Sequence, residues 1–167
     1  SVALVTILIL AISDTAVAQL EKYNVLWNTP STDSWGSMPI GNGDIGANIW
    51  VNPEGELHVY ISKTDAWSEN GRLLKIGKIK IAFTPGIIEN AKFKQELDLK
   101  TGTIRISTQR ANQWLDLDFW IDANNPVLIL NGQCSVPLQV EVEYEGWRNE
   151  RRKLTKDELF SAYGLVN

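Results

Sequence analysis

Apolar and polar residues alternate in twos along most of the chain after residue 50. Within residues 56–62, for example, Leu57, Val59 and Ile61 share one side, while His58 and Tyr60 share the other. A period of two is typical of a β-strand, whose successive side chains point to opposite faces of the sheet. This alternation, or a short run that is apolar throughout, predicts strands over residues 56–62, 78–83, 93–100, 103–108, 114–122, 127–130 and 138–145.

Turn residues separate the predicted strands. They occur at Asn52-Pro53-Glu54-Gly55, Asn70-Gly71, Thr101-Gly102 and Asn124-Asn125-Pro126. The strands recur at intervals typical of an all-β, antiparallel β-sandwich, which we expect to be supersandwich-like and truncated. Thr155 and Glu158 have the spacing of a capping box, which predicts a short helix near the C-terminus.

The first residues have the pattern of a secretory signal. Residues 2–12 form an uncharged apolar run too short to span a bilayer, and Ala16-Val17-Ala18 follows as a small-residue cleavage pattern. We interpret residues 1–18 as a partial signal peptide, with a buried N-terminal strand or helix as the alternative. Residues 19–167 are then an incomplete N-terminal β-sandwich domain of a larger exported protein, located in the periplasm, at the cell surface or outside the cell.

Composition limits the available chemistry. The net charge is −4, and the one basic cluster, residues 148–153, is interrupted by Glu150, so we expect no nucleic-acid partner. A single cysteine and a single histidine leave no intramolecular disulfide and no Cys/His metal site. We therefore expect no metal and no cofactor, no membrane association once the signal is cleaved, and Cys134 as an inert, buried small residue.

Gly41, Gly43 and Gly46 have the spacing G-x-G-x-x-G of a dinucleotide-binding loop. That function requires an apolar strand before the glycines and a helix after them. Pro39 interrupts the first, and residues 47–51 resemble a short strand rather than a helix. The sequence favours a tight turn between strands, in which glycine supplies a positive φ angle.

Several segments carry a resemblance. Trp35 and "MPIGNGDIGANIWV" at residues 38–51 resemble a stretch near the start of secreted inverting α-L-fucosidases of glycoside hydrolase family ninety-five. "ISKTDAW" at 61–67, "FKQELDLKTGTIRIS" at 93–107 and "NNPVLIL" at 124–130 are similar to later segments of that family. As whole segments, "MPIGNGDIG" and "ISKTDAW" most closely resemble a set of exported bacterial proteins with a domain of unknown function.

The resemblance implies an N-terminal sandwich that precedes an (α/α)6 barrel, with the hydrolytic carboxylates on the barrel, which this sequence does not contain. Lys63 and Thr64 stand where the fucosidases favour an Asn-Glu pair, so the resemblance implies action on a glycoside rather than a fucoside in particular. We expect no catalytic residue in this fragment. Lys63, Asp65 and Trp67 are our candidate substrate-binding residues at a cleft formed with the barrel, and a strand end with a local ion pair is the alternative.

Acidic residues two apart on a strand, such as Asp116 and Asp118, lie about 6.5 to 7 Å apart, close to the carboxyl spacing of inverting glycosidases. Glu96 and Asp98 share this spacing, as do Glu141, Glu143 and Glu145, so the pattern favours solvated sheet faces over a catalytic pair.

The seven tryptophans leave two functions open, because indole rings stack on sugars and also fill cores. Trp114 and Trp120 fall on the more polar face of their strand, where they either form a sugar platform or are covered by another layer. The chain is then either the non-catalytic sandwich of a glycoside hydrolase-like protein, packed on its barrel and directed at carbohydrate, or a free carbohydrate-binding or adhesion module.

Overall fold

The computed structural model describes residues 17–68, 71, 73–86, 88–147, 149–150 and 153. The helix predicted at Thr155 and most of the predicted signal peptide lie outside these residues. The described elements are the 3-10 helices η1 (Val17–Tyr23) and η2 (Ser34–Gly36) and the strands β1 (Val25–Trp27), β2 (Met38–Gly41), β3 (Ile45–Val51), β4 (Leu57–Trp67), β5 (Leu73–Thr84), β6 (Lys92–Asp98), β7 (Thr103–Arg110), β8 (Gln113–Ile121), β9 (Leu128–Cys134) and β10 (Gln139–Glu145).

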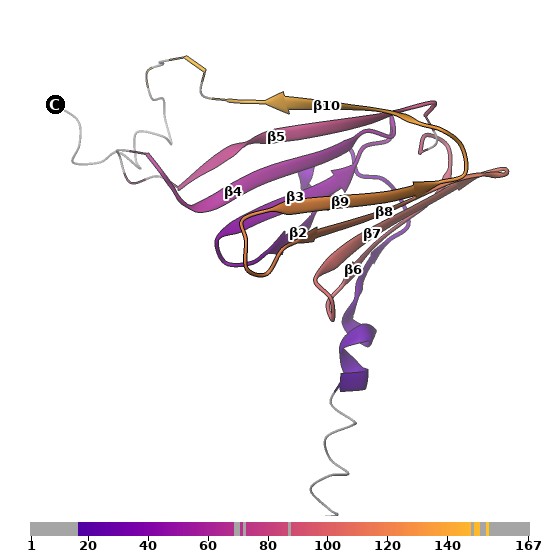
Figure 1. Cartoon of the computed structure of the whole chain (residues 1–167), viewed down its shortest axis with the longest axis horizontal. Helices are drawn as coiled ribbons and strands as arrows, with labels where there is room; N and C mark the ends of the chain where they lie inside the picture. The colour runs from indigo at the N-terminus through magenta and orange to yellow at the C-terminus, as the bar shows by residue number, and fades with distance from the viewer. Residues whose placement is uncertain are drawn as a thin grey trace, which may run out of the picture.

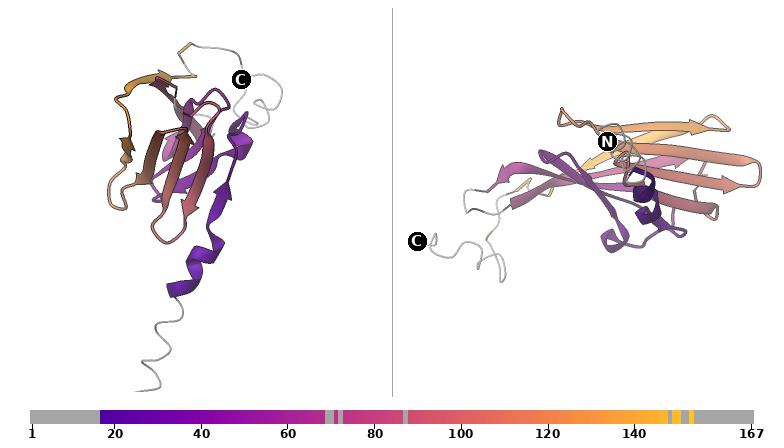
Figure 2. Two further views of the ribbon diagram at one scale, coloured as in Figure 1. Left: turned by 90° about the vertical axis from the view of Figure 1, so that its right-hand side faces the viewer. Right: turned by 90° about the horizontal axis from the view of Figure 1, so that it is seen from below.

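The strands form two five-stranded antiparallel sheets. Sheet A has the order β1-β6-β7-β8-β9, and sheet B has the order β10-β5-β4-β3-β2. The sheets lie over one another, while β4 and β5 extend past sheet A at the left of Figure 1 and η1 projects below β1 (Figures 1 and 2). The predicted all-β antiparallel sandwich is therefore confirmed.

The core lies between the inner faces of the two sheets and follows the period of two. Ile104 and Ile106 of β7 and Leu117 of β8 face Ile49 of β3 and Val59 of β4, and each is almost fully buried. Burying one such side chain stabilises the fold by about 1.5 to 3 kcal/mol. The alternation read from the sequence thus identifies the inward face of each central strand.

The glycine cluster forms a hairpin turn, as predicted. Gly41 ends β2, Ile45 begins β3, and Gly43 between them has φ 91°. The Asn42 side chain accepts the amide hydrogens of Asp44 and Ile45 and donates to the carbonyl of Asp122 over 2.8 Å. The turn is therefore closed by Asn42 and tied to the end of β8, and no helix follows it.

Other turns agree with the sequence. The amide of Gly55 donates to the carbonyl of Asn52 over 3.0 Å, and Gly102, with φ 64°, closes the hairpin between β6 and β7. Pro39 lies in β2, at the edge of sheet B, where a missing backbone donor is tolerated.

The two sheets do not cover each other completely. Val140, Val142 and Tyr144 of β10 share the inner face of sheet B with Phe83, Ile81 and Ile79, yet all three are exposed. Residues 131–134 at the end of β9 are exposed as well. The prediction that Cys134 is buried was therefore wrong: its strand neighbour Leu115 is covered by the core, but the sandwich has already opened at β9.

Candidate functional site

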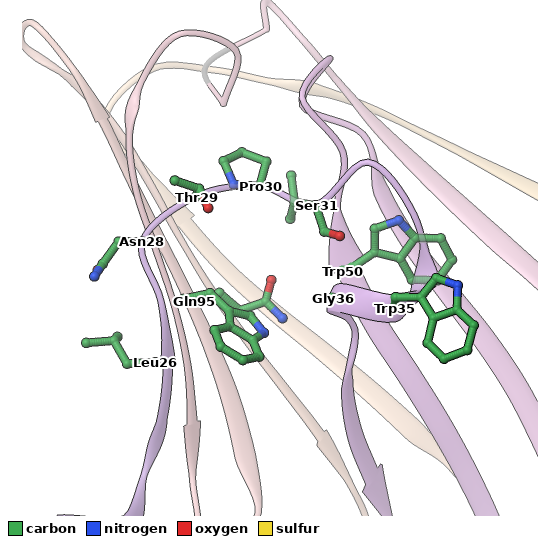
Figure 3. Close-up of a pocket in the computed structure, with 11 residues that line it drawn as sticks. Leu26, Asn28, Thr29, Pro30, Ser31, Trp35, Gly36, Trp50 and Gln95 are labelled. Carbon is green, nitrogen blue, oxygen red and sulfur yellow. The ribbon is translucent and has the colours of Figure 1, made fainter.

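A pocket of about 290 Å³ lies where the chain crosses from β1, at the edge of sheet A, to β2, at the edge of sheet B. We call it the tryptophan pocket. In Figure 3, Trp35 and Trp50 lie on one side, Leu26 and Gln95 lie on the other, and the segment from Thr29 to Ser31 crosses between them. It is lined by Leu26, Trp27, Asn28, Thr29, Pro30, Ser31, Trp35, Gly36, Trp50, Val51 and Gln95.

The pocket forms because β3 is longer than its partner at the edge. Met38 is the first residue of β2 and pairs with Ile49, so Trp50 and Val51 extend beyond β2. The segment that connects β1 to β2 lies beside this end of β3, which β2 does not reach, and the amide of Ser31 donates to the carbonyl of Val51 over 2.8 Å. The crossing segment therefore bridges the two edges and leaves a space beneath it.

Helix η2 fixes the outer wall. The Asp33 carboxylate caps this helix by accepting the amide hydrogen of Trp35 over 2.9 Å. Gly36 lies so close to Ser31 that a Cβ at residue 36 would overlap the serine side chain. These contacts fix the backbone of the helix. The Trp35 side chain projects into solvent, and the residue is 95% exposed.

The floor combines a polar and an aromatic group. Gln95 of β6 is almost fully buried, and its Nε2 donates to the carbonyl of Ile49 over 3.1 Å, which joins the two sheets beneath the pocket. Trp27 is 41% exposed, whereas Trp50 is buried. The pocket thus has one fully presented indole, one half-presented indole and one indole held within its wall.

Trp50 is held by a row of rings across the outer face of sheet B. Its ring stacks on His58, its direct neighbour on β4, with centroids 5.0 Å apart, and meets the edge of Tyr60 at 4.8 Å. Tyr60 in turn meets Trp147 at 5.2 Å. Such pairs are worth about 0.5 to 1.5 kcal/mol beyond their buried area, so the wall of the pocket is rigid.

The surroundings of His58 disfavour the charged form of its imidazole. Burial lowers its pKa below the usual 6.5, and the positive charge of Lys78 lowers it further. Its Nδ1 is buried and has no hydrogen-bond partner among the described residues, while Nε2 lies 3.6 Å from the Glu56 carboxylate. His58 therefore supports the aromatic row rather than presenting a base to a pocket.

The substrate-binding candidates Lys63, Asp65 and Trp67 lie on β4, at the opposite end of the strand from Leu57. Lys63 Nζ lies 2.6 Å from Asp44 Oδ1, in the glycine turn, and 3.0 Å from Asp65 Oδ1, and these carboxylates raise the lysine pKa. Trp67 is 58% exposed, and its Nε1 donates to the carbonyl of Thr64 over 2.7 Å. The segments at residues 38–51 and 61–67 thus meet in one ion-paired cluster, away from the tryptophan pocket.

A second hollow, of about 470 Å³, lies at one end of β6, β7 and β8 and carries charge. Lys92, Lys94 and Asp116 line it together with Trp114. Trp114 is exposed and Trp120 half-buried, both on the outer face of sheet A, as their parity predicts.

The acidic rows found in the sequence lie on outer sheet faces. Glu143 and Glu145 of β10 pair with Lys80 and Lys78 over 3.1 and 2.8 Å, and Asp118 of β8 pairs with Arg105 over 3.8 Å. Among the residues that the structure describes, no group of three or more His, Cys, Asp or Glu could hold a metal ion. No helix in this part of the chain is long and apolar enough to cross a membrane.

Sequence reasoning pointed to one member of the tryptophan pocket. Trp35 was named individually, beside the first motif of the resemblance, whereas Trp27, Trp50 and Gln95 were not named individually. Trp50 breaks the apolar alternation of β3 by facing outward, which was the available signal for it. For Gln95 the signal was a polar residue on the apolar face of β6.

Comparison with known proteins identifies one relationship. A family model named DUF5703_N and described as "Domain of unknown function (DUF5703)" matches residues 26–164. No curated protein matches the chain.

Proposed function

The chain belongs to the DUF5703_N family, and from that premise we propose that it is the non-catalytic N-terminal β-sandwich domain of an exported glycoside hydrolase-like protein. The observation that carries the proposal is the apolar inner face of β10, where Val140, Val142 and Tyr144 are exposed beside a core that covers Phe83 and Ile81. A sheet face of this kind is stabilised by another layer. We propose that further polypeptide of the same protein, including an (α/α)6 barrel, packs against the domain.

The placement of the carboxylates supports a non-catalytic role. Inverting hydrolysis needs two carboxyl groups on either side of one glycosidic bond, in surroundings that separate their pKa values. In the part of the chain that the structure describes, the residues lining the tryptophan pocket include no carboxylate, and those lining the hollow beside Trp114 include one, Asp116. Glu56, Glu141 and Glu143 do line a small hollow of about 110 Å³, but Lys80 lies among them and pairs with Glu56 and Glu143. Glu145 pairs with Lys78 on the same sheet face.

The ion-paired cluster suits a supporting role at a cleft. Lys63, Asp44 and Asp65 fix one another's side chains at the end of β4, and the Trp67 ring remains exposed beside them. We propose that Lys63, Asp65 and Trp67 form part of the rim of a cleft shared with the barrel, where they contact the carbohydrate or the barrel itself.

A second candidate function is a free carbohydrate-binding or adhesion module. The nearly complete exposure of Trp35 beside a hollow favours it, because an exposed indole offers a flat apolar face against which a sugar ring can pack. The two functions differ in whether a catalytic barrel shares the polypeptide.

The test compares this chain with the whole protein encoded by its reading frame. We expect several hundred further residues with the periodicity of helical hairpins, release of reducing sugar from a polysaccharide by the whole protein, and none by the chain alone. A stop codon soon after residue 167 would favour the free module. Hydrolysis by the chain alone at an enzyme-like rate would contradict both functions.

The packing role has its own test. Val142→Asp places a charge on the uncovered row of β10, where the chain alone tolerates it because the site is solvated. We expect the substitution to lower the melting temperature of the whole protein and leave that of the chain nearly unchanged. Glu141→Ala, on the outer face of the same strand, is the matched control and should leave both proteins unchanged. Equal melting temperatures for the Val142→Asp and native whole proteins would contradict the packing.

A further inference from the structure

We propose that the tryptophan pocket binds a ring of a neutral pyranose, with the Trp35 indole as its stacking surface. The proposal deepens the function above and rests on it for the expectation that the ligand is a carbohydrate. The choice of site, and of neutral over acidic sugar, comes from the residues around the pocket.

The first argument is charge. None of the eleven described residues that line the pocket is ionisable, and the polar side chains among them are Asn28, Thr29, Ser31 and Gln95. The Ser31 hydroxyl donates to the carbonyl of Asp33 and Gln95 to that of Ile49, so Asn28 and Thr29 are the groups we assign to the sugar hydroxyls. A neutral sugar can exchange hydrogen bonds with such groups. A uronate or sulfated sugar would lose solvation of its charge and find no lysine or arginine in return.

The hollow beside Trp114 gives the opposite case within the same molecule. It also has an exposed tryptophan, but Lys92, Lys94 and Asp116 surround it. Two exposed indoles thus lie in surroundings of different charge, and Trp35 is the one matched to an uncharged ring.

The second argument is size and shape. About 290 Å³ lies at the lower end of the range for ligand pockets, which suits one ring of a longer chain rather than a large cofactor. The C–H faces of a pyranose pack against an indole, and its hydroxyl edge needs hydrogen-bonding partners. Trp35 and Trp27 supply the indole surfaces, and the segment from Asn28 to Ser31 supplies hydrogen-bonding partners for the hydroxyl edge.

The third argument is preorganisation. Asp33 caps the helix that carries Trp35, Ser31 is bound to Val51, and Trp50 is held by His58 and Tyr60. Binding therefore requires little ordering of the backbone, which otherwise subtracts from affinity.

The test is calorimetric titration of the protein with cellohexaose, mannohexaose and xylohexaose as neutral probes and with hexagalacturonate as the acidic probe. We expect at least one neutral probe to bind at concentrations up to about 10 mM, and hexagalacturonate not to bind. Trp35→Ala should weaken that binding at least about tenfold, which corresponds to the loss of one stacked ring. Trp35→Phe, which keeps a smaller ring, should recover part of it.

Trp114→Ala is the matched control, since it removes an exposed tryptophan from the charged hollow. We expect it to leave binding unchanged. Because Trp35 is so exposed, its replacement should not alter the melting temperature, which separates lost binding from lost folding.

Each remaining outcome overturns the proposal: no binding of any neutral probe, equal binding of hexagalacturonate, binding that Trp35→Ala leaves unchanged, or binding that Trp114→Ala weakens as much as Trp35→Ala does. The binding result is independent of hydrolysis by the whole protein. Binding at Trp35 without hydrolysis by the whole protein would contradict the proposed enzyme and support the sugar site. Hydrolysis without binding at Trp35 would support the enzyme and contradict the sugar site.

Discussion

Four inward-facing residues that lie side by side across sheet B differ in how far they are exposed to solvent. Val51, Leu57, Ile81 and Val142 come from β3, β4, β5 and β10, and their exposed fractions are 1%, 0%, 6% and 63%. All four are apolar and face inward. The difference lies in what covers them: sheet A lies over the first three, and the last extends past it. An inward position is therefore not the same as a buried one.

The largest effect expected from this comparison comes from a matched pair of substitutions. Val59→Ala removes two methyl groups from a fully buried site, and we expect it to lower the free energy of unfolding by about 2 kcal/mol. Val142→Ala removes the same atoms from the uncovered strand and should cost less than about 0.5 kcal/mol. Urea titrations of the two variants measure both values, and equal losses would show that β10 is covered in solution.

The pH dependence of stability tests the surroundings of His58, on the outer face of sheet B. Because burial and Lys78 lower the pKa of folded His58 below 6.5, the unfolded chain binds this proton more readily than the folded one. Its contribution to stability is complete above pH 6.5 and is lost as the pH falls through 6.5 toward the folded value. We expect an effect smaller than that of Val59→Ala.

His58→Phe isolates this contribution, since it keeps a ring against Trp50 and removes the unpartnered Nδ1. The variant should lose less stability than the native protein between about pH 7 and pH 5. Glu96 and Glu145 do not interfere in that window, because lysine partners Lys94 and Lys78 lower their pKa values below 4.5. Identical pH profiles for the two proteins would contradict a depressed His58 pKa.

The smallest effect is expected at the ion-paired cluster. Lys63→Met breaks contacts with Asp44 and Asp65, but these groups are partly exposed and their interaction is screened by salt. We expect a small drop in melting temperature that disappears near 1 M NaCl, where the Debye length is about 3 Å. A drop as large as that of Val59→Ala, or one that persists in salt, would show that the cluster acts through packing.

Much of the fold could be predicted from the sequence, because six of the ten described strands have a clear period of two and a seventh, β9, begins with an apolar run. β1 and β2 were missed as strands, since β1 has three residues and β2 has four, one of them a proline, which is too few to show a period. The ends of β4 and β5 were also missed: these strands reach Trp67 and begin at Leu73, beyond the regions of clear alternation. The period of two indicates which face of a strand is buried, but it does not indicate how far two paired strands extend.

The candidate site was less accessible to sequence reasoning. The tryptophan pocket combines residues 26–31 and 35–36 with Trp50, Val51 and Gln95, and these segments meet only because β1 joins sheet A while β3 joins sheet B. The cluster around Lys63 was partly accessible, since both of its motifs were recognised, but the contact with Asp44 depends on the pairing of β3 with β4. Tertiary pairing of this kind leaves no local pattern.

The error at Cys134 has the same origin as the contrast in sheet B. Its burial was predicted from residue type alone, because a free cysteine is commonly a small buried residue. Cys134 pairs with buried Leu115, yet it is exposed because the sandwich is open at the end of β9.

The chain has one cysteine, so labelling of its thiol measures the open side directly. A thiol-reactive dye is added to the native protein and to the protein in denaturant, and the two rates are compared. We predict that native Cys134 reacts within about tenfold of the unfolded rate, because exposure governs thiol reactivity at a given pKa. Reaction only upon global unfolding would show that β9 is covered, and would contradict the open sandwich on which the account depends.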